Sequence, residues 1–209
     1  GSLAYKDDSN RILEFEKSLN WEDKQEVLFW RGASSGLGMN GPNWMQADRV
    51  RVSMKCKELG DSRFDAYLSK IVDYGYEDSH VKPYELGLVR DFVPFEEFLK
   101  YKYLLDVDGI SCAWYSCFLK LFAESTVVKV QSEFVQWYYD RMQPWIHFVP
   151  VSPSLNEVPR LLNWLVQNDE ECRKIARNGR ELVSTLSIES EKRSLQMLIK
   201  EILSFERSS

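Results

Sequence analysis

Short apolar runs alternate with longer amphipathic stretches along this chain of 209 residues. Runs such as EVLFW and TVVKV are rich in large or β-branched apolar residues and are too short for long helices, so they predict buried strands. The predicted strands are residues 26–30, 101–107, 126–130 and 147–151, with a weaker candidate at 64–72.

The stretches between these runs carry apolar residues every three or four positions, which predicts helices. A capping box at Ser154–Glu157 is expected ahead of a helix that contains Val158 and Leu165. The other predicted helices are 10–19, 46–59, 94–100, 114–124, 133–141 (ended by Pro144), one around 175–183 and one around 195–202.

Strands that alternate with helices predict an α/β fold with a mainly parallel, Rossmann-like sheet flanked by helices. The chain has neither an internal repeat nor a Pro/Gly-rich linker. We therefore expect an N-terminal helix and linker at 1–24, and a single α/β domain at 25–209. Ligands of such a sheet bind beyond the carboxyl ends of the strands.

Composition and charge argue against several classes of function. Apolar residues make up 44% of the chain, which is enough for a substantial core, and a net charge of -5 gives no basic surface for a nucleic-acid partner. No run of 18 apolar residues predicts a transmembrane segment, and no signal peptide is present. The opening Gly1-Ser2 resembles a cloning remnant. We therefore expect the lumen of the endoplasmic reticulum or Golgi if a secretory signal was removed, and the cytoplasm otherwise.

The cysteines and histidines do not predict a zinc site. The four cysteines lack C-x-x-C spacing, and the chain has only two histidines. We expect buried thiols, with one disulfide as an alternative in the secretory pathway. His147 is expected to be a hydrogen-bonded core residue within a strand, since no Ser or Cys nucleophile stands at a recognisable spacing from it.

The small-residue loop 31–38 after the first predicted strand is a candidate anion site. Backbone N–H groups, together with Arg31 and with Arg49 or Arg51 on the next helix, would suit a phosphate or diphosphate. The loop matches neither the P-loop motif nor G-x-G-x-x-G, and an ordinary turn with a solvated arginine explains it equally well.

Asp106-Val107-Asp108 has two interpretations. Such a pair binds a divalent cation in some metal-dependent transferases through hard oxygen ligands. Alternate residues on a strand point to opposite faces, however, so the two carboxylates converge only if the strand has already ended. The other interpretation is that Asp106 braces a neighbouring loop and that Asp108-Gly109 forms a turn.

Glu133 is predicted to open the helix 133–141 at the same edge of the sheet. A carboxylate there is favoured by the helix dipole. It would also suit ribose hydroxyls, and the sequence does not separate these two roles.

Six segments together resemble the C-terminal half of the Rumi-type protein O-glucosyltransferases. That family, the lipopolysaccharide-modifying glycosyltransferases, also includes the fungal capsule-associated xylosyltransferases. The segments keep the family's order and spacing from about residue 25 to 205, and they are FWRGASSG, ADRVRV, YKYLLDVDG, STVVKV, PWIHFVPV and RKIARNGRELV.

The resemblance implies the C-terminal lobe of a GT-B fold. It also implies inverting transfer of a sugar, usually glucose or xylose, from a UDP-sugar donor to a hydroxyl of a protein or glycan acceptor, with no metal and no other cofactor. The general base would be an aspartate in an N-terminal acceptor lobe that has no counterpart in this chain.

By position, the resemblance implies a set of donor-binding residues. The family's serine after Arg-Gly is Ala33 here, and Ser34 or Ser35 would replace it. The family's arginine on the next helix corresponds to Arg49, with Arg51 close behind. The full set is Arg31, Gly32, Ala33, Ser34, Ser35, Arg49, Asp108, Gly109, Ile110, Ser111, Cys112, Ala113, Trp114, Tyr115 and Glu133.

One departure from the family pattern leaves two alternatives open. Many members carry an arginine shortly after the glycine that corresponds to Gly109, and this chain has none there. The first alternative, which this departure and Ala33 favour, is a catalytically degenerate member that acts as a binding module. The second rests on the aspartate pair and is a metal-dependent single-domain transferase that uses Asp106 and Asp108.

Overall fold

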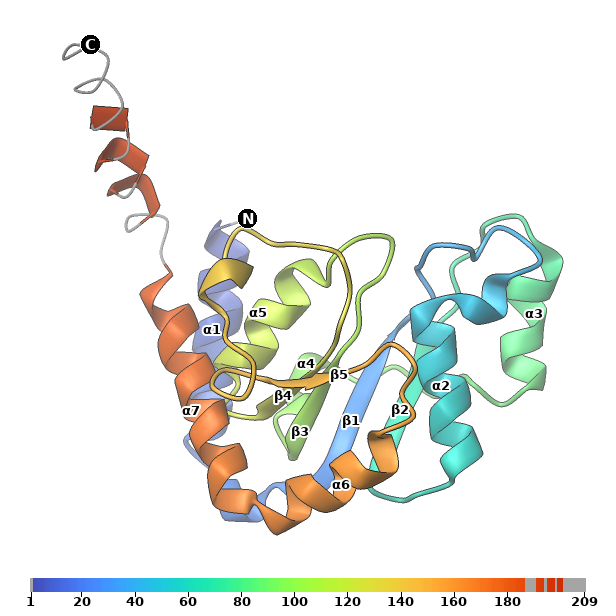
Figure 1. Ribbon diagram of the computed structural model, residues 1–209, viewed down its shortest axis with the longest axis horizontal. Helices are drawn as coiled ribbons and strands as arrows, with labels where there is room; N and C mark the ends of the chain where they lie inside the picture. The colour runs from blue at the N-terminus through green and yellow to red at the C-terminus, as the bar shows by residue number, and fades with distance from the viewer. Residues whose placement is uncertain (1, 187–190, 194, 198, 201–209) are drawn as a thin grey trace.

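Five parallel strands form one sheet at the centre of the molecule (Figure 1). The computed structural model describes residues 2–186, 191–193, 195–197 and 199–200. The strand order is β2-β1-β3-β4-β5, and every neighbouring pair is parallel, as expected for a Rossmann-like α/β fold. The strands are β1 (Gln25–Ala33), β2 (Phe64–Lys70), β3 (Tyr101–Asp106), β4 (Thr126–Val130) and β5 (Val149–Val151).

The sheet is buried on both faces, because the central strands β1, β3 and β4 carry consecutive apolar residues that point to either face. Leu28 and Trp30 of β1 pack into a cluster with α2 (Asp48–Leu59) and α6 (Val158–Gln167). Phe29, between them, packs into a second cluster on the other face.

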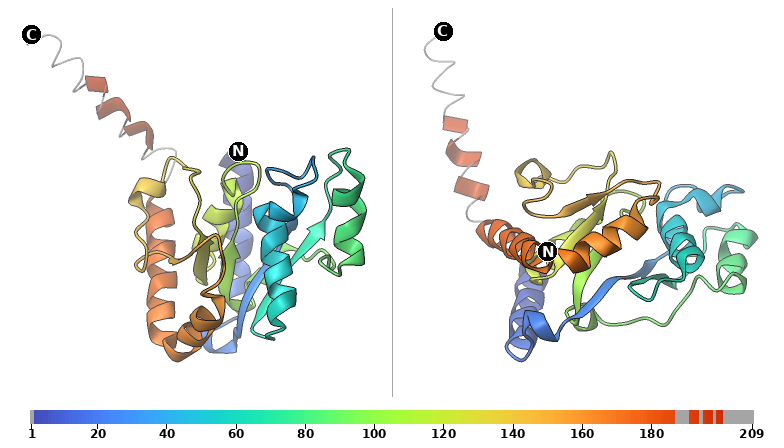
Figure 2. Two further views of the ribbon diagram at one scale, coloured as in Figure 1. Left: turned by 45° about the vertical axis from the view of Figure 1, so that its right-hand side comes forward. Right: turned by 60° about the horizontal axis from the view of Figure 1, so that its bottom comes forward.

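The helices form a layer on each face of the sheet (Figure 2). The second cluster takes residues from α1 (Ser2–Glu16), the short α4 (Phe95–Phe98) and α5 (Trp114–Phe122). The long α7 (Asp169–Thr185) contributes to both clusters, with Ile175 in the first and Val183 in the second. Among the described helices, none has the length and apolar character needed to cross a membrane.

The sheet reverses its winding at β1. The chain passes from β1 outward to β2, and then returns to place β3 on the other side of β1. Pairing between β1 and β3 reaches only Phe29 and Leu104, whereas β1 continues beside β2 as far as Ala33. The switch point at the carboxyl ends of β1 and β3, called the crevice below, is therefore where open α/β sheets of this order bind ligands.

Several helix and strand boundaries differ from those predicted from the sequence. The first helix begins at Ser2 instead of residue 10, and β1 extends to Ala33, so that part of the predicted anion loop is strand. The helix predicted at 46–59 begins at Asp48, after a 3₁₀ turn at Trp44–Gln46.

The prediction of a helix at 133–141 is wrong. The segment is an irregular loop with one 3₁₀ turn at Tyr139–Arg141, so Glu133 does not open a helix. The Ser132 hydroxyl accepts the N–H of Phe134 at 3.2 Å, and such a local side-chain bond competes with helical hydrogen bonding.

A helix missing from the sequence prediction, α3 (Glu77–Glu85), follows β2. Pro83 within it and its many exposed polar residues conceal the helical period. His147 lies in a turn before β5, not in the strand, and its Nδ1 accepts the N–H of Gln143 at 2.9 Å.

The predicted capping box is also wrong in detail. Glu157, the N-cap of α6, accepts the amide N–H and the hydroxyl of Ser152 instead of pairing with Ser154. Of the last predicted helix, Leu195 is helical, but Leu198 and Ile202 lie outside the described residues.

Candidate functional site

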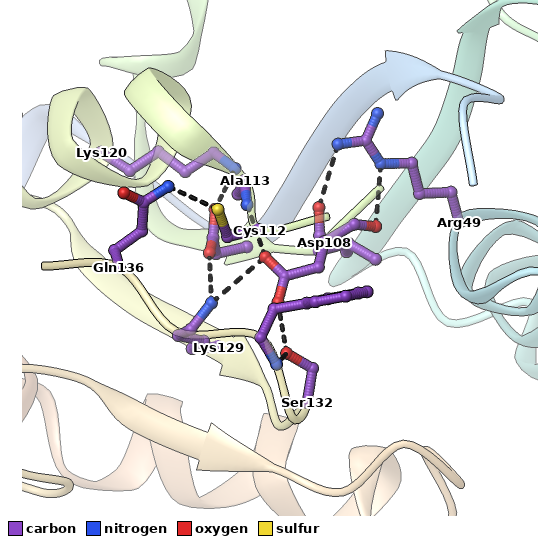
Figure 3. A network of polar contacts seen from close by, with 11 residues as sticks. Arg49, Asp108, Cys112, Ala113, Lys120, Lys129, Ser132 and Gln136 are labelled. Carbon is purple, nitrogen blue, oxygen red and sulfur yellow. Dashed lines mark hydrogen bonds and ion pairs between the residues drawn. The ribbon is translucent and has the colours of Figure 1, made fainter. Parts of the chain in front are cut away.

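Arg49, in the first turn of α2, spans the crevice between β1 and β3 (Figure 3). Its guanidinium reaches the ends of both strands and donates four hydrogen bonds. Nη1 donates to the carbonyl of Ala33 at 3.1 Å and the hydroxyl of Ser35 at 2.7 Å. Nε donates to the carbonyl of Asp108 at 3.1 Å, and Nη2 to that of Val107 at 3.2 Å.

Gly109 allows this close packing. A Cβ at this position would lie 3.1 Å from both Cζ and Nη2 of Arg49, and 3.2 Å from the carbonyl oxygen of Ser35. Burial lowers the pKa of Arg49, and the charges of Asp106 and Asp108 oppose that shift. An arginine remains protonated under these conditions, so the crevice contains a fixed positive charge.

Asp108 organises the loop that follows β3. Its side chain is buried; Oδ1 accepts the N–H of Ala113 at 2.6 Å, and Oδ2 accepts the hydroxyl of Ser132. The N–H of Gly109 donates to the carbonyl of Ser111 at 2.8 Å. Asp108 thus braces the loop between the end of β3 and the start of α5.

Asp106 is fully buried between two lysines. Its carboxylate accepts from Lys120 and from Lys129, each at 2.9 Å, and Lys129 also lies 3.6 Å from Asp108. The coulombic attraction and hydrogen bonds of the two ammonium groups outweigh desolvation, and they hold the pKa of Asp106 well below its ordinary range.

These neighbours do not fit a divalent cation at Asp106 and Asp108. Lys129 already occupies the space beside both carboxylates, so a metal ion would face a buried positive charge. Among the described residues, no three His, Cys, Asp or Glu side chains are grouped as metal ligands. The metal interpretation of Asp106-Val107-Asp108 is therefore not supported by the arrangement of its donors.

The cysteines are free and buried among the described residues, which confirms the expectation of buried thiols. Cys112 lies in the loop after β3, where its sulfur accepts the side-chain N–H of Gln136. Burial raises the pKa of Cys117 to about 12, so this thiol is protonated at neutral pH and is a poor nucleophile.

Three of the predicted donor residues are engaged elsewhere. Nη2 of Arg31 donates to both carboxylate oxygens of Asp65 in β2, at 2.8 and 2.9 Å. Ser34 is buried, and its hydroxyl accepts the N–H of Val72. Tyr115 donates to Asp8 of α1 at 2.8 Å. These contacts do not favour direct roles for Arg31, Ser34 and Tyr115 in binding a donor.

Four other predicted residues lie at or near the carboxyl edge of the sheet. Ile110 is 55% exposed, and Glu133 is exposed in the loop after β4. Gly32 lies in β1, where a Cβ would meet the Trp30 ring at 2.5 Å. Trp114 is the first residue of α5.

Sequence reasoning missed Lys129, Ser132 and Gln136 as members of this network. One signal was available, since Lys129 interrupts an otherwise apolar strand, and a lysine there must find a buried partner. Ser132 and Gln136 gave no signal because their contacts depend on the path of an irregular loop.

Solved structures share this architecture. The Anabaena Alr3699/HepE structure in complex with UDP-glucose aligns over 92% of this chain and 52% of its own, with a TM-score of 0.53 and 15% identity. A sucrose-phosphate synthase from Thermosynechococcus elongatus aligns over 92% of this chain and 49% of its own, with a TM-score of 0.52 and 11% identity. These proteins are GT-B glycosyltransferases, and at such identities the likeness concerns the fold alone.

Curated relatives are more similar in sequence. Protein O-glucosyltransferase 2 of Danio rerio is 30% identical over 165 residues, which is 79% of this chain and 30% of the relative. Protein O-glucosyltransferase 3 of Homo sapiens is 31% identical over 160 residues, 77% of this chain and 28% of the relative. O-glucosyltransferase rumi of Drosophila melanogaster is 34% identical over 95 residues, 44% of this chain and 23% of the relative.

The chain thus spans about three tenths of the length of the first two relatives. The sequence profile of glycosyl transferase family 90 matches residues 4–192, which include every residue of the crevice. This chain belongs to glycosyl transferase family 90.

Proposed function

We propose that this chain is the donor-binding part of a glycosyltransferase that uses a UDP-sugar. The transferred sugar would be glucose or xylose, the acceptor a hydroxyl of a protein or glycan, and the stereochemistry inverting. The observation that carries the proposal is the match to glycosyl transferase family 90 over residues 4–192, joined to a polar crevice at the switch point of the sheet.

The donor would lie at the carboxyl ends of β1 and β3. Ser35 and Arg49 come from one side of this crevice, and the loop from Asp108 to Ala113 comes from the other. Backbone N–H groups at the starts of α2 and α5 add partial positive charge at the same edge. Glu133 is exposed at this edge and would suit ribose hydroxyls.

The catalytic share of this part would be electrostatic. Fixed positive charge in the crevice stabilises the negative charge that develops on the departing UDP. No residue of this chain is proposed as the general base, and no metal or other cofactor is proposed, because Lys129 occupies the space between Asp106 and Asp108.

Calorimetry of UDP against this chain tests the proposal, with ADP as the control for base selectivity. We expect UDP to bind with a dissociation constant below one millimolar, and ADP to bind more weakly. If UDP at millimolar concentration gives no heat while circular dichroism reports an intact fold, the proposed donor site is wrong.

A catalytically degenerate binding module is the second candidate. It is favoured by Ala33 in place of the family's serine, and by the lack of an arginine shortly after Gly109. The longest natural chain should be assayed for transfer and for hydrolysis of UDP-glucose. UDP binding without either activity would favour the binding module over the enzyme.

We also propose a cellular compartment for the protein. Relatives are named protein O-glucosyltransferases, so a secreted or membrane protein in the lumen of the endoplasmic reticulum or Golgi would be a suitable acceptor. Fusing a fluorescent protein to the full natural chain and imaging it against organelle markers tests this assignment; a cytoplasmic signal would contradict it.

A further inference from the structure

We propose that Arg49 is a positioning residue for the nucleotide, and not a primary ligand of its diphosphate. Its guanidinium would hold the loop after β1 and the loop after β3 in the single arrangement that accepts a nucleotide. This inference rests on the proposed function, since it concerns how the same crevice takes its shape.

The first argument is the number of hydrogen-bond donors. A guanidinium has five N–H donors. Arg49 directs four of them to acceptors of its own chain: three backbone carbonyls and the hydroxyl of Ser35. Within the described part of the chain, one N–H, on Nη2, is left without an acceptor. A bidentate contact to a phosphate needs two parallel donors.

The second argument is the position of these bonds in the sheet. Backbone pairing between β1 and β3 ends at Phe29 and Leu104, and the two strands separate beyond that point. Arg49 joins the separated ends, because it binds the carbonyl of Ala33 on one side and that of Val107 on the other. It thereby links two strand ends where pairing between β1 and β3 has stopped.

The third argument is close packing around the guanidinium. Gly109 approaches so closely that a Cβ would stand 3.1 Å from Cζ of Arg49. On another side, Cζ lies 6.0 Å from the centre of the Trp30 ring. A guanidinium held in this way orients the loops but has little freedom to follow a phosphate.

Two ligands separate a positioning role from a direct contact. The substitution Arg49→Lys keeps the positive charge but cannot make the four bonds. If Arg49 positions the loops, affinity for UDP and for uridine should fall by a similar factor. We expect a loss of about tenfold for each ligand, which corresponds to about 1.4 kcal/mol of binding free energy. If Arg49 binds the diphosphate, UDP should lose affinity while uridine does not.

Gly109→Ala provides a second variant that leaves every charge in place. It should weaken both ligands, and its effect should not add to that of Arg49→Lys, because the two substitutions disturb the same contact. Gly41→Ala is the matched control, since a Cβ there has no heavy atom within 4 Å. Arg173→Lys is the control for the arginine substitution, because Arg173 contacts Glu22 far from the crevice.

Binding is measured by ligand-observed NMR for uridine and by calorimetry for UDP, with circular dichroism as the check of folding. Amide hydrogen exchange adds a readout that is independent of nucleotide, and Arg49→Lys should increase exchange in 33–38 and 107–113. Unchanged exchange there, or selective loss of UDP affinity, overturns the inference but not the proposed function. If the parent chain binds neither ligand, both fail.

Discussion

Asp106 illustrates how buried charge is tolerated at the scale of single residues. Its carboxylate is fully buried, and the ammonium groups of Lys120 and Lys129 satisfy both oxygens. A group of this kind does not need to add net stability, but removing one member leaves unpaired charge in a medium of low dielectric.

Asp106→Asn should therefore lower the free energy of unfolding by about 3–5 kcal/mol. Urea denaturation followed by tryptophan fluorescence measures this change. Glu97→Gln is the matched control, because Glu97 pairs with Lys100 on the exposed surface and should cost less than about 1 kcal/mol. Equal costs for the two substitutions would contradict the role assigned to burial.

Lys24 should make stability depend on pH in the alkaline range. Its Nζ donates to the carbonyls of Ala123 and Glu124 and to the hydroxyl of Ser125, and burial lowers its pKa to about 8. Between pH 8 and the unfolded value near 10.5, the unfolded chain binds more protons than the folded one. Stability contributed by this group therefore rises with pH in that window.

The measurement compares the parent with Lys24→Met between pH 7.5 and 9.5. The parent should gain about 2 kcal/mol of unfolding free energy relative to the variant, since one pKa unit corresponds to about 1.4 kcal/mol. Lys17→Met, at an exposed ion pair, serves as the control. A pH-independent difference between parent and Lys24→Met would disprove this linkage.

Only some residues of the site could be predicted from the sequence, and the reason is physical. Arg49, Ser35 and the loop after Asp108 follow strand ends, and the alternation of strands and helices places strand ends together. The partners of Asp106 were not predictable, because Lys120 and Lys129 come from different elements and meet only after packing. The ion pair of Arg31 was likewise not predictable, because it depends on Asp65 in the neighbouring strand β2.

At the scale of elements, α7 packs unusually closely against its surroundings. Gly179 is buried, and a Cβ there would lie 3.0 Å from the carbonyl oxygen of His147 and 3.1 Å from the Leu121 side chain. The glycine thus sets the distance between α7, α5 and the turn before β5.

Gly179→Ala should destabilise the protein although alanine is the better helix former. The gain in helix propensity is about 1 kcal/mol, and overpacking costs about 1–3 kcal/mol. We expect a net loss of up to about 2 kcal/mol in urea unfolding. Arg177→Ala, on the exposed side of the same helix, should be close to neutral; a stabilised Gly179→Ala would show that the turn moves aside without cost.

The strands β1, β3 and β4 were predictable because each is a short apolar run with residues buried on both faces. Strand β2 alternates buried and half-buried residues, so its signal was weaker. The helix expected at 133–141 was not found, because apolar content alone does not establish a helical face: Val135 and Trp137 are exposed, whereas Tyr138 is buried. Helix α3 escaped prediction because its exposed surface and internal proline leave almost no period.

At the scale of the whole molecule, the strand order decides where a ligand binds. The order places β1 and β3 side by side although β2 lies between them in sequence. No local pattern contains that information, because the order follows from how the crossover helices pack. The alternation of elements predicted the class of fold, and the comparison with family members was needed for the donor.

A nucleotide bound in this crevice should stabilise the whole fold without help from a metal ion. At a UDP concentration one hundred times the dissociation constant, the unfolding free energy should rise by about 2.7 kcal/mol. Differential scanning fluorimetry should detect this as an increase in Tm that EDTA leaves unchanged. A shift that disappears with EDTA and returns with manganese would point to the metal-dependent alternative.

The separation of β1 from β3 along the chain also has a consequence for synthesis. β1 leaves the ribosome well before β3, which is one of its two partners in the sheet. Until β3 arrives, the apolar residues Leu28, Phe29 and Trp30 lack part of their cover, and parallel sheets built from such distant pairings fold slowly. Nascent chains that end before residue 101 should therefore bind chaperones more strongly than chains that extend past 130, which pull-down of stalled ribosomes would reveal.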